Sequence, residues 1–179
     1  AIMTRPFIIA EMSGNHNKSL KTALQIVDAA AECGCNAIKL QTYTADTMTI
    51  NSKQPEFLIN DENSLWKDEN LYSLYQKAST PYEWHKTIFN RCKEKGIIGF
   101  STPFDTTSVD FLESINCPIY KIASFENEDY TLLKRIARTN KPVIMSLGML
   151  NIEQIAKSIK VLTDNGCTNL SLLKCTSTY

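Results

Sequence analysis

Two lysines stand out because each lies within an apolar stretch that is typical of a buried strand. Lys39 lies in the sequence AIKLQ, and Lys121 lies in IYKIA. A lone ammonium group is costly to bury, so each lysine needs a carboxylate or another anion close by. The two lysines could bind the phosphate and the carboxylate of one ligand, or each could pair with a glutamate, Glu11 or Glu126. Alternatively, Lys121 could form a Schiff base, because burial lowers the pKa of a lysine.

Hydroxyl side chains follow the later apolar stretches, at Ser101, Thr102, Ser124, Ser146, Thr176 and Ser177. Each one alone also suits a turn or a helix cap. Their recurrence at successive strand ends favours a shared anionic ligand. Ser124 lies three residues after Lys121, so the two side chains can act together only if the strand ends or bulges near Ala123.

The two histidines do not by themselves form a metal site. His16 follows the turn-forming sequence SGN, where it could be a ligand, an acid or base, or a hydrogen-bonded loop residue. His85 adjoins Trp84 in an amphipathic segment, and we predict that it lies on the helix surface. The sequence TPYE at residues 80–83 predicts a capping box at the start of that helix.

The chain alternates apolar strands with amphipathic helices. Strands are predicted at residues 7–10, 37–41, 97–100, 119–123, 142–145 and 170–174. Residues 43–80 form a long loop with a short helix at 71–78, a length typical of lids or binding loops. The alternation implies parallel strands with right-handed crossovers. Polar residues at the strand ends favour an α/β fold of the (β/α)8 TIM-barrel type, of which this chain carries six of the eight βα units.

Composition limits the function classes. The 179 residues suit one domain, and 19 basic residues balance 19 acidic ones. The zero net charge argues against nucleic acid and anionic membranes as partners. No apolar run is long enough to cross a bilayer. The six scattered cysteines lack C-x-x-C spacing and are predicted to be buried free thiols in a cytoplasmic protein.

Five segments in chain order carry a resemblance, and they read IAEMSGNHN, KLQTYT, STPFD, YKIASFE and KCTSTY. Together they resemble the sialic acid synthase family. Residues 42–47 and 65–85 are similar to its pseudaminic acid branch. The resemblance implies that phosphoenolpyruvate condenses with the open-chain aldehyde of an N-acetylated amino sugar. A nine-carbon keto acid forms, pseudaminic acid in this branch, and phosphate leaves by C–O cleavage.

The resemblance also implies roles for single residues. Three residues would hold the carboxylate of phosphoenolpyruvate: Lys39, Thr102 and Ser124. Three others would hold its phosphate: Lys121, Ser146 and Ser177. Glu11 would manage a proton or the attacking water. The sugar would be faced by Gln41, Glu126 and Tyr179. Glu11, Lys39 and Lys121 are thus the expected catalytic residues.

The chain departs from the family pattern at several points. Leu147 stands where the family usually has threonine. The family's metal-binding histidines lie on strands seven and eight, so the Mn²⁺ or Mg²⁺ ligands are expected outside this chain. We therefore interpret residues 1–179 as an incomplete N-terminal phosphoenolpyruvate-binding barrel without the C-terminal antifreeze-like domain. Alone it should be inactive, whereas the complete enzyme should be a homodimer. The alternatives are a Schiff-base aldolase using Lys121 and a non-catalytic sugar-phosphate binding module.

Overall fold

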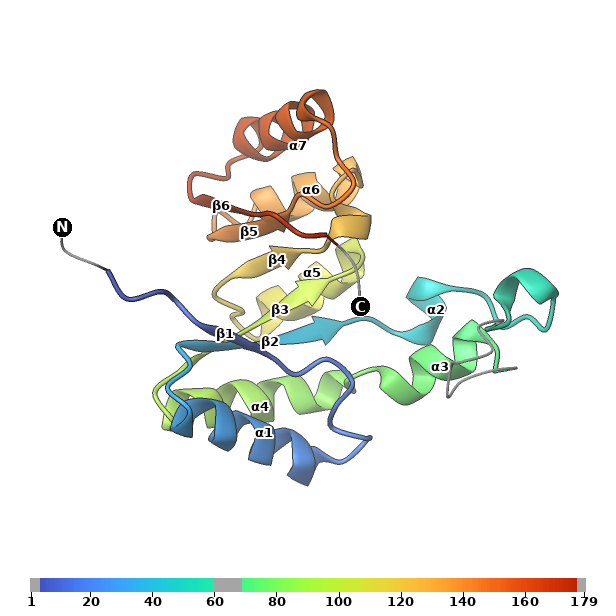
Figure 1. The fold of residues 1–179 in the computed structure, drawn as a ribbon, viewed down its shortest axis with the longest axis vertical. Coiled ribbons are helices and arrows are strands. Elements are labelled where there is room, and N and C mark those ends of the chain that lie inside the picture. The colour runs from blue at the N-terminus through green and yellow to red at the C-terminus, as the bar shows by residue number, and fades with distance from the viewer. Residues whose placement is uncertain (1–3, 60–68, 177–179) are drawn as a thin grey trace. The chain divides into compact units, whose positions relative to one another are not determined.

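A computed structural model describes residues 4–59 and 69–176 of the chain. It divides into two compact units, residues 1–97 and 98–179. In both units β-strands alternate with α-helices, as Figure 1 shows. The six cysteines are free thiols, as predicted, but only Cys92, Cys117 and Cys167 are buried, whereas Cys33 is exposed. None of the helices in the described ranges is both long enough and apolar enough to cross a membrane.

The first unit begins with a parallel strand pair. Strand β1 (Ile9–Glu11) pairs with β2 (Ala37–Thr42), and helix α1 (Leu20–Glu32) connects them. Ser19 caps α1 by accepting a hydrogen bond from the backbone of Thr22. In this register Glu11, the last residue of β1, lies opposite Lys39 of β2, so two residues with predicted roles lie side by side.

The segment after β2 contains more regular structure than the predicted loop. Helix α2 (Ala45–Met48) and a 3₁₀ turn (Pro55–Phe57) precede helix α3 (Leu71–Ala78), whose predicted bounds are confirmed. Side-chain caps explain why these short helices form. Thr44 and Thr47 make a reciprocal capping box, and Asn70 accepts a hydrogen bond from the backbone of Ser73.

Helix α4 (Tyr82–Glu94) starts differently from the prediction. The predicted capping box is wrong, because Pro81 occupies the N-cap position and makes no side-chain cap. The hydroxyl of Thr80 is instead within 3.0 Å of the ring of His16. Farther along, Arg91 donates two hydrogen bonds of 2.7 Å to Asp28 and so joins α4 to α1.

The second unit contains four parallel strands in the order β3-β4-β5-β6. They are β3 (Ile98–Pro103), β4 (Tyr120–Ile122), β5 (Val143–Ser146) and β6 (Leu170–Leu173). The intervening helices are α5 (Thr106–Ser114), α6 (Tyr130–Ala137) and α7 (Ile152–Asp164). Their N-caps are Asp105, Asp129 and Asn151.

The core of this unit lies between strands and helices. Fully buried side chains come from the strands (Phe100, Tyr120, Ile122 and Met145) and from the helices (Leu112, Leu132, Leu133, Ile136 and Leu162). Burial of this much apolar surface stabilises the strand positions. It therefore fixes the backbone at the strand ends, where the hydroxyl and charged residues follow.

Candidate functional site

Glu11, the last residue of β1, forms an ion pair with Lys39, which lies in the middle of β2. The Lys39 Nζ lies 2.7 Å from Glu11 Oε1, and the side chains are 12% and 50% exposed. The Met12 amide also donates a hydrogen bond to the Lys39 carbonyl, at 3.0 Å. Gln41 lies two residues along β2 and so shares a face of the strand with Lys39. Lys39 therefore pairs with Glu11, which is one of the alternatives that the sequence leaves open.

Lys121 lies in β4 and is only 8% exposed. Its Nζ donates hydrogen bonds to Ser146 Oγ at 2.6 Å and to the Ile122 carbonyl at 3.0 Å. Ser146 is the last residue of β5, and the Cys175 thiol lies 3.3 Å from its hydroxyl. A buried ammonium group and a hydroxyl thus meet where two parallel strands end. This donor pair is suited to a phosphate or carboxylate oxygen.

The chain leaves β4 through a 3₁₀ turn, Ser124–Glu126, directly after Ala123. The strand therefore ends where the spacing of Lys121 and Ser124 requires it to end. Burial raises the pKa of Glu126, the charge of Asp129 raises it further, and the charge of Lys121 opposes both. A carboxyl group in this setting can keep its proton at a higher pH than an exposed glutamate, so it can act as a proton donor.

Two buried oxygen atoms of the second unit have no hydrogen-bond partner among the described residues. They are Thr102 Oγ1, in a side chain 2% exposed, and Glu126 Oε2. An unsatisfied buried polar atom costs about 1–3 kcal/mol. A bound polar ligand or an ordered water molecule would remove this cost.

Ser124 and Ser146 are thus placed at the ends of β4 and β5, and Thr102 lies in β3. The structure brings Lys121 into contact with Ser146, and Glu126 lies within electrostatic reach of both Lys121 and Asp129. Two predicted site residues, Ser177 and Tyr179, lie outside the described residues.

Both histidines are buried in the first unit, so the prediction of a surface position for His85 is wrong. His85 Nδ1 lies 3.0 Å from the Pro81 carbonyl and Nε2 lies 2.9 Å from Thr42 Oγ1. Because a carbonyl can only accept, Nδ1 carries the proton. Burial lowers the pKa of His85 to about 4. His85 therefore acts as a neutral link between the end of β2 and the start of α4.

His16 has the opposite tautomer. Its Nδ1 accepts a hydrogen bond of 3.1 Å from the Lys18 amide, so Nε2 donates to Thr80 Oγ1. Burial and the charge of Lys18 lower its pKa. Its ring also contacts Trp84 edge to face, with 5.4 Å between the centroids. Of the roles open from sequence, His16 therefore has that of a hydrogen-bonded loop residue.

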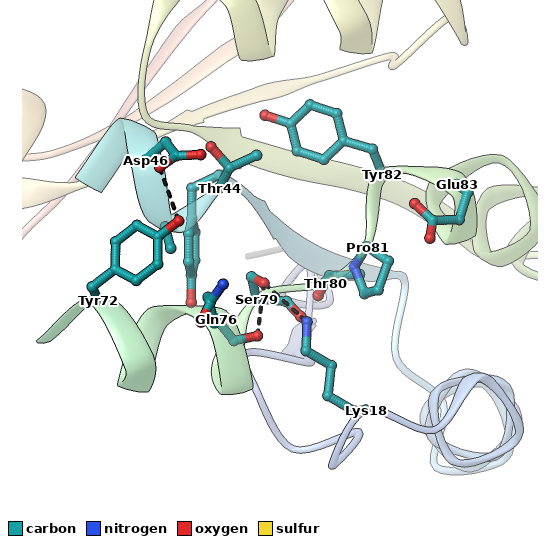
Figure 2. A pocket seen from close by; sticks show the side chains of 12 residues that line it. Lys18, Thr44, Asp46, Tyr72, Gln76, Ser79, Thr80, Pro81, Tyr82 and Glu83 are labelled. Carbon is teal, nitrogen blue, oxygen red and sulfur yellow. Dashed lines mark hydrogen bonds between the residues drawn. The ribbon is translucent and has the colours of Figure 1, made fainter. Parts of the chain in front are cut away.

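A pocket of about 390 Å³ lies in the first unit between α2, α3 and the start of α4. Figure 2 shows Lys18 reaching Ser79, where its Nζ donates to the backbone and hydroxyl oxygens, and Tyr72 reaching Asp46. Of the predicted site residues that the structure describes, none lines this pocket. Lys18 and Ser79, like Tyr72 and Asp46, already hydrogen-bond to each other in this pocket. In contrast, Thr102 Oγ1 and Glu126 Oε2 in the second unit have no partner among the described residues.

The fold defines a parallel α/β protein that has charged and hydroxyl side chains near the carboxyl ends of its strands. Residues 26–179 match the NeuB family, and the chain belongs to that family. It is 45% identical to pseudaminic acid synthase of Helicobacter pylori over 174 residues, 97% of this chain and 51% of that protein. It is 36% identical to N,N'-diacetyllegionaminic acid synthase of Campylobacter jejuni, over 99% of this chain and 53% of that protein.

Solved structures agree with this assignment. N-acetylneuraminic acid synthetase of Leptospira borgpetersenii, in complex with citrate, superposes with a TM-score of 0.84 and 29% identity over 98% of this chain and 56% of that chain. A truncated 3-deoxy-D-arabino-heptulosonate 7-phosphate synthase of Thermotoga maritima shares the fold at a TM-score of 0.66 and 14% identity. The predicted TIM-barrel type of α/β fold is thereby confirmed. The chain spans about half the length of the curated relatives it matches.

Proposed function

We propose that this chain is the phosphoenolpyruvate-binding part of a sugar-acid synthase. The enzyme would condense phosphoenolpyruvate with an open-chain N-acetylated amino sugar to give a nine-carbon keto acid. Pseudaminic acid is the proposed product, because the Helicobacter pylori synthase of that name is 45% identical and the Campylobacter jejuni legionaminic acid synthase is 36% identical. Residues 1–179 would be the N-terminal barrel portion of this enzyme.

One observation carries the proposal. A buried lysine, Lys121, donates to a strand-end hydroxyl in a unit that also holds two buried oxygens without partners among the described residues. A ligand with several anionic oxygens and a polar carbon skeleton would satisfy these groups. Phosphoenolpyruvate has a phosphate at one end and a carboxylate at the other.

We assign the two anionic ends to different residues. The phosphate is bound by Lys121, Ser146 and Ser177, and the carboxylate is bound by Lys39, Thr102 and Ser124. A compact ammonium charge beside hydroxyl donors suits each end, because hydrogen bonds to ionised groups are about twice as strong as neutral ones. Glu11, which pairs with Lys39 at 2.7 Å, would orient that ammonium group before substrate arrives.

The reaction joins carbon 3 of phosphoenolpyruvate to the aldehyde carbon of the sugar. The aldehyde oxygen takes up a proton and becomes a hydroxyl, while positive charge develops on carbon 2. Water adds at carbon 2 and loses a proton, and phosphate leaves with the bridging oxygen to yield the ketone. Gln41, Glu126 and Tyr179 would face the sugar. The raised pKa of Glu126 suits it to protonate the aldehyde oxygen, and Glu11 would take the proton from water.

The family resemblance implies a divalent metal, Mn²⁺ or Mg²⁺, in the complete enzyme. Within residues 4–59 and 69–176, no three His, Cys, Asp or Glu side chains gather as a cation site. The described residues therefore do not fit this metal, and we place its ligands outside this chain. A cytoplasmic location and a homodimer complete the proposal.

Calorimetry with phosphoenolpyruvate tests the assignment in the protein encoded by the full reading frame. Lys121→Met should weaken binding by about tenfold or more, because a charge-assisted contact contributes about 1.5–3 kcal/mol. The control, Lys160→Met, removes an ammonium group that is 75% exposed and paired with Asp164, so binding should not change. Equal binding by both variants would contradict the assignment.

Chemical assays separate the alternatives. The proposed synthase releases phosphate when phosphoenolpyruvate, manganese and the amino sugar are all present. Borohydride added with pyruvate should trap no adduct, whereas an adduct at Lys121 would establish the aldolase instead. Binding of phosphoenolpyruvate without any phosphate release would favour the non-catalytic module.

A further inference from the structure

We propose that Asn127 is a positioning residue, which holds Ser146 in place for the phosphate group of the substrate. This inference rests on the proposed function. Asn127 directly follows the 3₁₀ turn Ser124–Glu126 and is only 3% exposed. This role is not evident from sequence, because an asparagine within the polar stretch ENED is typical of an ordinary turn.

The side-chain amide of Asn127 joins two carbonyl groups of the loop after β5. Its Nδ2 donates to the Ser146 oxygen and to the Gly148 oxygen, both at 3.1 Å. The first carbonyl belongs to the peptide unit between Ser146 and Leu147, and the second to the peptide unit after Gly148, so one amide group restrains both. The Asn127 backbone carbonyl accepts a hydrogen bond of 2.7 Å from the hydroxyl of Ser158, which is fully buried in α7. Asn127 thus ties the ends of β4 and β5 to one helix.

These hydrogen bonds of Asn127 lie where the pairing between β5 and β6 ends. The β5–β6 register ends at the pair Ser146 and Leu173, and the Leu147 amide makes one further bond to the Leu173 carbonyl at 2.9 Å. Beyond this point, Asn127 restrains the carbonyls that the strand pairing no longer orders. The direction of the Ser146 hydroxyl, 2.6 Å from Lys121 Nζ, depends on this backbone.

The chemistry of the contact requires an amide. Both partners of Nδ2 are carbonyl acceptors, so an aspartate of the same shape would place charge against two oxygens. An alanine would leave two buried carbonyls without this donor. If Asn127 contributed only to protein stability, its replacement would weaken the binding of all ligands equally or of none. A positioning role weakens specifically the ligands that reach Ser146.

Calorimetry on Asn127→Ala in the protein encoded by the full reading frame tests the proposal, with phosphoenolpyruvate and pyruvate as the two ligands. Phosphoenolpyruvate should bind about tenfold more weakly than to the unaltered protein, which corresponds to about 1.4 kcal/mol. Pyruvate has the carboxylate but no phosphate, so its affinity should stay within about twofold. The control is Asn165→Ala, because Asn165 Nδ2 donates to the Val161 carbonyl at 2.8 Å on the far turn of α7.

Ser158→Ala provides a second variant if Asn127→Ala does not fold, and it should show the same selective loss at smaller size. Unchanged affinity for phosphoenolpyruvate, or an equal loss for both ligands, would overturn the role of Asn127 and leave the proposed function standing. If the unaltered protein does not bind phosphoenolpyruvate, the proposed function is refuted. The proposed role of Asn127 is then refuted as well.

Discussion

Acidification should destabilise the first unit through His85. The side chain is fully buried and its pKa is lowered to about 4 from an ordinary value of 6.5. As the pH falls below 6.5, the unfolded chain takes up a proton at His85, whereas the folded chain resists protonation until about pH 4. The unfolded state binds more protons in this window, so the free energy of unfolding decreases as the pH falls.

The magnitude follows from the two pKa values. Between pH 7 and pH 4.5 the loss from His85 alone is about 2 kcal/mol, and little further loss is expected below pH 4. Urea unfolding followed by tryptophan fluorescence measures this, because Trp84 adjoins His85 in the sequence and its ring contacts His16. The free energy of unfolding is compared at the two pH values.

His85→Asn is the matched variant, since its side-chain amide can still donate to the Pro81 carbonyl. It should be less stable at pH 7 but should lose about 2 kcal/mol less on acidification than the unaltered protein. Carboxylates and His16 titrate in both proteins, so the difference isolates His85. If both proteins lose the same free energy between pH 7 and pH 4.5, the reasoning is refuted.

Two further predictions concern stability, and thermal unfolding monitored by circular dichroism checks both. Ile122→Ala should cost about 2–5 kcal/mol because the side chain is fully buried in β4, whereas Ile152→Ala, 83% exposed, should cost about 0.5 kcal/mol or less. Equal costs would contradict the assigned core. Gly166→Ala should destabilise more than Gly34→Ala, although both have positive φ, +114° and +82°. A Cβ at Gly166 would lie 2.6 Å from Asn140 Oδ1, while open space surrounds Gly34. The reverse order would show that the backbone at Gly166 relaxes freely.

The helix starts of the second unit were predictable because their signals are local. Asp105, Asp129 and Asn151 each cap a helix by accepting a hydrogen bond from the backbone three residues on. Such a bond involves one short stretch of chain, so the residue type and its position suffice. The same holds for the break in β4 after Ile122, which the spacing of Lys121 and Ser124 required.

The residues whose predicted position or role was wrong or missing have hydrogen-bond partners far along the chain. Thr80 was expected to cap α4, but its hydroxyl bonds to His16, 64 residues earlier. His85 was expected on the surface, yet its ring bonds to Thr42, 43 residues away, and packs against Phe89. The role of Asn127 cannot be inferred from its sequence neighbours, because the two carbonyls it joins lie 19 and 21 residues later.

The sequence by itself determined the alternation of strands and helices, the lysines within apolar strands and the hydroxyl residues that follow them. These follow from periodicity and from the cost of burying a charge, which can be read from neighbouring residues. Only the tertiary structure decided which acceptor each buried donor meets: Glu11 for Lys39, Ser146 for Lys121, and the loop carbonyls for Asn127. A hydrogen bond depends on distance and direction in space, and packing of distant segments sets both.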